Sequence, residues 1–173
     1  IRSASRLINA LRLFSHADQR RRVRRSRCVL RKLRSFEGEH RCACVFAYMR
    51  QVDPLLFEEL VLSALEDAGA FVLRNRRYSG DGGVDGMAWV NGIGWCAVPA
   101  KRYAAHVSNE HVAAFPKLVA ASRPRAGLFV HTGRTGTASY QALRGSRLLL
   151  LSGERFARLI LDRYLSAGPG VRI

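Results

Sequence analysis

The clearest helical pattern in the chain begins at Asp53 and ends at Gly69. Asp53 is a good N-cap, Pro54 suits the first helical position, and Gly69 favours termination. Apolar residues recur between them at the spacing of one helix face. This stripe comprises Leu56, Leu60, Val61, Ala64, Leu65 and Ala68. The pattern predicts a helix with one face in the core.

Short apolar runs separated by turn residues predict strands in the following segment. The first covers residues 71–73, the second about 84–90 and the third about 95–101. Asn91 and Gly92 form a hairpin signal between the second and third runs. Residues 127–131 and 148–151 are further apolar runs and are expected to form buried strands.

Helical patterns alternate with these later strands. Ser108 can cap a helix that runs to about Ala121 and contains Pro116, which is expected to kink it. Further helices are predicted over residues 138–144 and, after Ser152, over residues 155–165. This order of elements predicts an α/β fold, a three-layer α/β/α sandwich around a mixed central sheet.

Residues 1–52 form a basic, arginine-rich extension before the predicted domain at 53–173. Apolar residues between Leu7 and Leu13 suggest an amphipathic helix that packs on the main domain or lies on a membrane surface. The following arginine-rich segment is expected to be helical or disordered. Residues 42–48 are short and apolar, which fits either a strand or the lead-in to the next helix.

Charge separates this extension from the remainder of the chain. The formal net charge is +16 and the pI is about 11.2. Residues 1–52 hold 14 basic and 3 acidic side chains, a net charge of +11, which leaves +5 for residues 53–173. A surface this rich in arginine favours a polyanionic partner, although a solvated arm is an equally good interpretation. The candidate DNA contacts are Arg20, Arg21, Arg22, Arg24, Arg25 and Arg27.

The four cysteines, at positions 28, 42, 44 and 96, do not form two zinc-binding pairs of the usual spacing. They also do not resemble a disulfide framework, so we expect a reducing, cytoplasmic environment. No apolar run approaches the ~18 residues that a transmembrane helix needs, so no transmembrane segment is expected.

Candidate chemistry lies on the second and third predicted strands. Asp85 belongs to the second strand and Lys101 comes near the end of the third. Because alternate side chains of a strand share a face, position 99 points the same way as Lys101. A carboxylate and a lysine on adjacent strands can hold a divalent metal beside a phosphodiester and stabilise the charge of the transition state. Position 99 is Pro99, which has no ligand atom and avoids paired strand positions, so the two strands are expected to separate near Lys101.

The order of these motifs resembles the Mrr-type restriction endonuclease domain of the PD-(D/E)xK nuclease superfamily. The resemblance rests on residues 57–61 (FEELV), 68–69 (AG), 80–86 (GDGGVDG) and 98–103 (VPAKRY), with Phe115 and residues 127–132 (GLFVHT) fitting the later part. It covers roughly residues 53–165. It implies a restriction-endonuclease-like fold and cleavage of double-stranded DNA.

This resemblance suggests a role for each site residue. Asp85 and Glu58 would bind Mg²⁺, for which Mn²⁺ can substitute, and the backbone carbonyl of Ala100 would be a further ligand. Lys101 would orient or activate the attacking water. Arg102 and Tyr103 would contact the phosphate backbone.

A second interpretation also fits these residues. In the family, Gln, Glu or Asp precedes the lysine by two positions, and Pro99 departs from this pattern. The alternative is therefore a catalytically impaired nuclease fold that still binds DNA. Both a monomer and a homodimer are left open.

Overall fold

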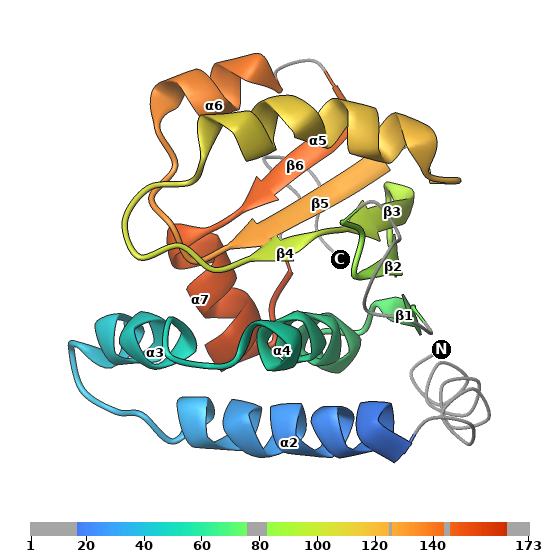
Figure 1. Ribbon diagram of the computed structural model, residues 1–173. Helices are drawn as coiled ribbons and strands as arrows, with labels where there is room; N and C mark the ends of the chain where they lie inside the picture. The colour runs from blue at the N-terminus through green and yellow to red at the C-terminus, as the bar shows by residue number, and fades with distance from the viewer. Residues whose placement is uncertain (1–16, 76–82, 125, 144–145, 166–173) are drawn as a thin grey trace.

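The computed structural model describes residues 17–75, 83–124, 126–143 and 146–165 (Figure 1). Its helices are α2 (Ala17–Arg34), α3 (Arg41–Met49), α4 (Pro54–Asp67), α5 (Asn109–Ala121), α6 (Thr137–Ala142) and α7 (Gly153–Asp162). Its strands are β1 (Phe71–Arg74), β2 (Gly86–Val90), β3 (Gly94–Val98), β4 (Ala100–Lys101), β5 (Ala126–His131) and β6 (Leu148–Leu151).

The sheet is mixed, as predicted. Strands β1, β2 and β3 pair antiparallel, and β5 pairs parallel with β3, β4 and β6. In the pairing of β3 with β5, Cys96 lies opposite Ala126, and in the pairing of β4 with β5, Lys101 lies opposite His131. The partners are the same number of residues apart in the sequence in both cases. Strands β3 and β4 are therefore one strand that Pro99 interrupts.

The expected separation of the two strands at Pro99 is confirmed. The pairing of β2 with β3 ends at Gly86 and Val98, whereas β4 pairs with β5. Proline has no N–H to donate, and the carbonyl of Pro99 still accepts a hydrogen bond of 2.9 Å from the N–H of Val130. The strand thus stays attached to β5 while it leaves β2.

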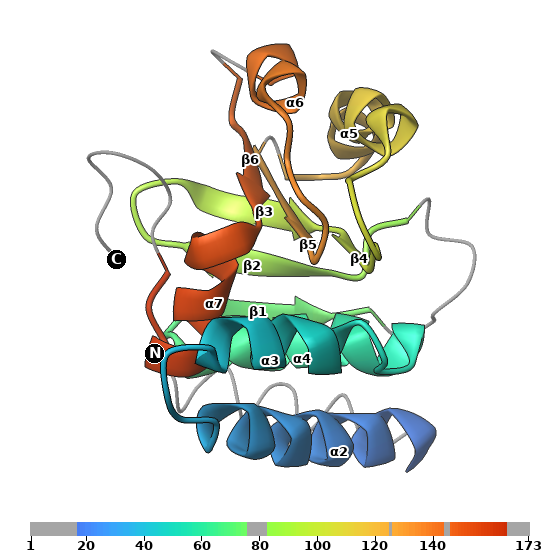
Figure 2. The same cartoon turned by 90° about the vertical axis from the view of Figure 1, so that its left-hand side faces the viewer.

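Helices cover both faces of the sheet. Figures 1 and 2 show α5 and α6 on one face and α3, α4 and α7 on the other, with α2 as a further layer outside α4. The close approach of α5 to β5 requires glycine at position 127, since a Cβ atom there would lie 2.6 Å from side-chain atoms of Phe115 and Val119. The predicted three-layer α/β/α sandwich is confirmed, and α2 is added to it.

The described part of the extension contains two helices, α2 and α3. Both helices contribute fully buried side chains to the hydrophobic cluster between α4 and the sheet. These are Leu30 and Leu33 of α2 and Val45 and Met49 of α3. This core therefore crosses the boundary expected after residue 52. Residues 42–48 lie within α3, so the strand interpretation was wrong and a helix forms instead. The apolar stripe at Leu7–Leu13 lies outside the described residues.

Polar contacts add to the docking of α2 on α4. The hydroxyls of Ser26 and Ser63 lie 2.9 Å apart, and Arg34 forms an ion pair of 2.7 Å with Asp67. Arg27 forms a further ion pair, of 2.9 Å, with the buried Glu66. Buried polar groups need such partners, so these contacts fix how α2 sits on α4.

The end of α7 differs from the prediction. Helix α7 ends at Asp162 rather than Leu165, because Arg163 adopts the left-handed conformation with φ of 55°. Helix α4 is as predicted, and the carboxylate of Asp53 accepts a hydrogen bond from the N–H of Leu56. Within the described ranges, no helix is long and apolar enough to cross a membrane.

Candidate active site

The candidate site lies where β2 and the interrupted β3–β4 strand separate. Asp85 immediately precedes β2, and its N–H donates to the carbonyl of Val98 at 3.1 Å. The Oδ2 atom of Asp85 accepts the N–H of Ala100 at 2.6 Å. The carboxylate therefore spans the gap that opens beyond Val98 and is fixed directly beside Lys101.

The carbonyl of Ala100 points to the Asp85 side of this strand. Carbonyls alternate in direction along a strand, and those of Pro99 and Lys101 accept hydrogen bonds from Val130 and Thr132 of the β5 segment. The Ala100 carbonyl between them must face away from β5. It lies on the side where β2 has diverged, which is the direction expected for a metal ligand.

Pro99 and Lys101 share a face, as the strand period predicted. Both line a cavity of about 290 Å³ beneath α5, together with Gly83, His111 and Phe129. A longer polar side chain at position 99 would therefore enter the space that Lys101 borders.

Glu58 belongs to α4, on the face of the sheet opposite α5, and it interacts with the charges of Asp85 and Lys101. Its pKa is raised to about 7, first by burial and then by the charge of Asp85, while Lys101 lowers it. Burial also raises the pKa of Asp85 to about 6, against the effects of the Ala100 N–H and Lys101. The three residues are thus close enough for their charges to interact, and both carboxylates are poorly solvated.

This donor set fits a hard divalent cation. Two carboxylates and a carbonyl are oxygen ligands, and the raised pKa values mean that nearby positive charge would favour the ionised forms. No group of three or more His, Cys, Asp or Glu side chains with metal-binding geometry occurs among the described residues. Mg²⁺ is compatible with so few protein ligands, since it retains several waters.

Glu59, the neighbour of Glu58, has a different role. It is 1% exposed, and its carboxylate accepts a hydrogen bond of 2.9 Å from Nε of Arg74. Arg74 also contacts Ser63 and Glu66 in the same buried network. Glu59 therefore joins α4 to β1, and its charge acts on Asp85 and Glu58 from within this buried network.

The two residues after Lys101 make protein contacts. Arg102 donates from Nη1 to the carbonyl of Arg50 at 2.6 Å. The hydroxyl of Tyr103 lies 2.5 Å from Nδ1 of His111, and burial raises the pKa of Tyr103 to about 12. Both side chains are partly exposed beside the site.

The arginines of α2 do not all have the same surroundings. Arg21, Arg24 and Arg25 are exposed, whereas Arg20 and Arg22 are partly buried and Arg27 is paired with Glu66. Figure 2 shows α2 separated from the sheet by the layer that contains α4. The helix therefore lies apart from Asp85 and Lys101.

His131 lies in the interior of the protein, at the end of β5. It is fully buried between Phe129 and Tyr103, and burial lowers its pKa to about 4. The histidine is therefore neutral at physiological pH, and its Nε2 atom lies 3.3 Å from the hydroxyl of Thr135.

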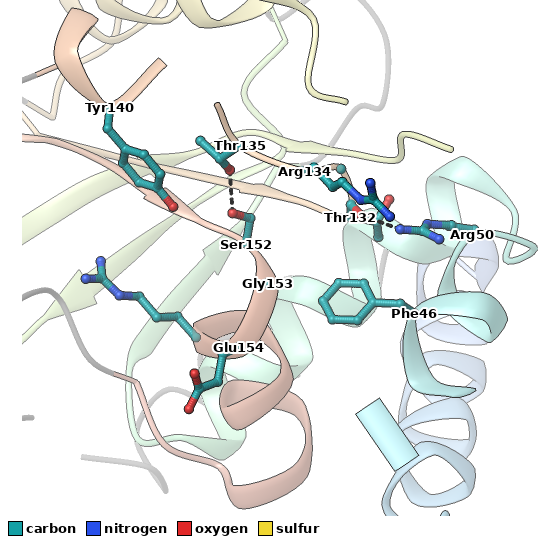
Figure 3. Close-up of a pocket in the computed structure, with 11 residues that line it drawn as sticks. Phe46, Arg50, Thr132, Arg134, Thr135, Tyr140, Ser152, Gly153 and Glu154 are labelled. Atoms are coloured by element: carbon teal, nitrogen blue, oxygen red, sulfur yellow. Dashed lines mark hydrogen bonds between the residues drawn. The ribbon is translucent and has the colours of Figure 1, made fainter. Parts of the chain in front are cut away.

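Sequence reasoning missed a basic pocket on the same edge of the sheet. Arg50, Arg134 and Arg155 line it, and Thr132, which directly follows β5, forms part of its wall (Figure 3). These arginines come from three separate segments, after α3, after β5 and at the start of α7, and they show no motif along the chain. The only indication of this pocket in the sequence was that these segments contain arginines.

One family of known proteins matches most of the chain. A family sequence model described as restriction endonuclease, of the Mrr catalytic type, matches residues 49–160. The chain belongs to this Mrr-type restriction endonuclease family. The match begins in the last residue of α3, before the boundary expected at residue 53, and includes Glu58, Asp85 and Lys101. Comparisons with curated proteins and with solved structures gave no significant match.

Proposed function

We propose that this Mrr-type protein is a metal-dependent endonuclease that hydrolyses phosphodiester bonds in double-stranded DNA. The observation that supports the proposal is that Asp85, Lys101 and Glu58 lie close enough for their charges to interact, near the point where two strands separate. This group of residues combines oxygen ligands with a positively charged side chain. Family membership independently supports a nuclease.

Each residue has a proposed task. Asp85, Glu58 and the Ala100 carbonyl would hold Mg²⁺ or Mn²⁺, which when bound would polarise the phosphate and lower the pKa of a water. Lys101 would place its ammonium group against the attacking water and the negative charge that grows on the phosphate. The hydrogen bond from the Ala100 N–H would keep Asp85 in one orientation before DNA arrives.

Arg102 and Tyr103 are proposed to contact DNA next to the scissile phosphate. Their contacts with Arg50 and His111 hold both side chains at the rim beside Lys101. The arginines of α2 are proposed to bind further backbone phosphates without sequence preference. They are the exposed Arg21, Arg24 and Arg25, together with Arg20, Arg22 and Arg27 of the same helix.

Plasmid nicking tests the catalytic proposal. The parent protein is expected to nick supercoiled DNA with Mg²⁺ or Mn²⁺, and Lys101→Ala is expected to lower turnover by a factor on the order of 10²–10³. Asp85→Ala should abolish metal binding. Asp85→Asn is the sharper variant, because its amide oxygen can still accept the Ala100 N–H while the charge is lost.

A binding titration on the same variants is the control. DNA binding should survive each substitution, since arginines elsewhere carry most of the positive charge. Nicking that continues unchanged in both Asp85→Asn and Lys101→Ala would refute the proposed site.

The second candidate is a DNA-binding module that no longer cleaves. Pro99 is the observation that favours it, because the ligand position that faces the same cavity as Lys101 has no donor atom. This candidate predicts no metal-dependent nicking by the parent, and tighter DNA binding by Asp85→Ala because a negative charge that faces phosphate is removed.

A further inference from the structure

The basic pocket missed by sequence reasoning has a volume of about 500 Å³. Figure 3 shows Arg50 and Arg134 near each other on one side and Tyr140 on the other. The start of α7 forms the floor between them, with Ser152, Gly153 and Glu154. The lining contains three arginines and one glutamate, a formal charge of +2.

The frame of the pocket is fixed by hydrogen bonds. The hydroxyls of Thr135 and Ser152 lie 2.6 Å apart and link the β5 loop to the start of α7. The backbone of Arg134 is held on both sides, since its N–H donates to Ala105 at 2.7 Å and its carbonyl accepts from Val107 at 3.0 Å. The pocket is therefore formed before any ligand binds.

The cationic groups remain accessible. Arg134 and Arg155 are exposed, and neither forms an ion pair among the described residues. Arg50 is also exposed and donates from Nη2 to the carbonyl of Thr132 at 3.2 Å. Guanidinium groups bind phosphate oxygens in pairs, and the hydroxyl of Tyr140 can donate as well.

The pocket is joined to the candidate active site by direct contacts. The N–H of Thr132 donates to the carbonyl of Lys101 at 3.3 Å, and the carbonyl of Arg50 accepts from Arg102. Both sites thus lie at the carboxyl ends of the parallel strands β4, β5 and β6. A polyanion that passes Lys101 along this edge would reach the pocket next.

We propose that this pocket binds a backbone phosphate of the DNA, away from the phosphate positioned at Lys101 and Asp85. The inference rests on the proposed function, because it takes DNA as the substrate. The DNA would thus have two phosphate contacts at this edge of the sheet, one at Lys101 and Asp85 and one in the pocket. The arginines of the pocket that bind the second phosphate are Arg50, Arg134 and Arg155.

The test measures duplex binding by fluorescence anisotropy over a range of salt concentrations, with EDTA present to prevent cleavage. Arg134→Gln and Arg155→Gln should each lower affinity about eightfold at 0.1 M salt and reduce the salt slope by about 0.9, the effect of one lost phosphate contact. Arg147→Gln is the matched control. Arg147 is exposed, and it precedes β6 at the opposite edge of the sheet. This control should bind as the parent does.

The outcomes separate this inference from the proposed function. If both pocket variants bind like the Arg147 control, the pocket does not contact DNA and the inference is wrong. If AMP binds the parent and Arg155→Gln removes only that binding, the pocket takes a free nucleotide and the inference is also wrong. If the parent binds DNA but does not cleave it, the proposed endonuclease activity is wrong. The binding comparison of the pocket variants with the parent would still decide whether the pocket contacts DNA. A parent that does not bind DNA would refute both.

Discussion

At the scale of single residues, the sequence identified the candidate site residues but not their contacts or pKa values. Asp85 and Lys101 could be selected from the strand pattern and their family motifs. The bond between Asp85 and the Ala100 N–H could not, because it depends on the gap that opens after Val98. The raised pKa values of Asp85 and Glu58 likewise depend on burial and on neighbours that are distant in the sequence.

His131 gives a prediction at this scale. Because its pKa is lowered from 6.5 to about 4 in the folded protein, the unfolded chain binds more protons between these values. The contribution to stability is present above pH 6.5 and is lost as the pH falls towards 4. The expected loss is at most about 3 kcal/mol, from 1.36 kcal/mol per pKa unit. Urea unfolding at pH 7 and pH 4 measures it.

Two variants isolate this contribution. His131→Gln can retain a contact with Thr135 but does not titrate, so its stability should fall less between pH 7 and pH 4. The exposed His40 is the control, and His40→Gln should follow the parent. Identical pH dependence in His131→Gln and the parent would contradict the assignment.

At the level of secondary-structure elements, Pro99 interrupts the third strand predicted from the sequence. The sequence predicted one strand over residues 95–101, and the common register of β3 and β4 with β5 confirms its continuity. The interruption follows from the missing N–H of proline and the departure of β2. The proline therefore opens the crevice that holds Asp85 and Lys101, while it removes a ligand from the same face.

Substitution of Pro99 tests both effects. Pro99→Gln should raise metal affinity on the order of tenfold or more and increase the nicking rate, because a ligand enters the cavity beside Lys101. Pro99→Ala is the matched control, since it restores the N–H without a ligand. Calorimetric titration with Mn²⁺ and a nicking assay make the comparison. If Pro99→Gln is no better than Pro99→Ala in a folded protein, the missing ligand is not what limits metal binding.

At the level of the whole molecule, the N-terminal segment has two roles in one helix. Leu30 and Leu33 of α2 belong to the central core, whereas Arg21, Arg24 and Arg25 face solvent. Deletion of residues 1–34 would therefore remove core residues together with charge. Only substitution of the exposed arginines can measure their contribution to DNA binding.

The triple variant Arg21→Gln, Arg24→Gln, Arg25→Gln is expected to bind duplex DNA less tightly and with a smaller salt slope. Each arginine that contacts a phosphate should contribute about 0.9 to the slope, so the fall should not exceed about 2.7. The control replaces Lys117, Arg123 and Arg147 with glutamine, which removes the same charge from exposed positions elsewhere. Equal slopes in the two variants would show that α2 acts only through net charge.

The sequence by itself determined the order of most elements, the mixed α/β/α architecture, and Asp85, Lys101 and Glu58 as candidates. These depend on local information: strand and helix periods, the Asp53 cap, the Asn91-Gly92 turn, and short motifs that match a family. Only the tertiary structure decided that α2 and α3 join the core, that Glu59 is bound to Arg74, and that three arginines form a pocket beside the site. Those features arise from contacts between residues far apart in the chain, and no local periodicity encodes which distant partners will meet.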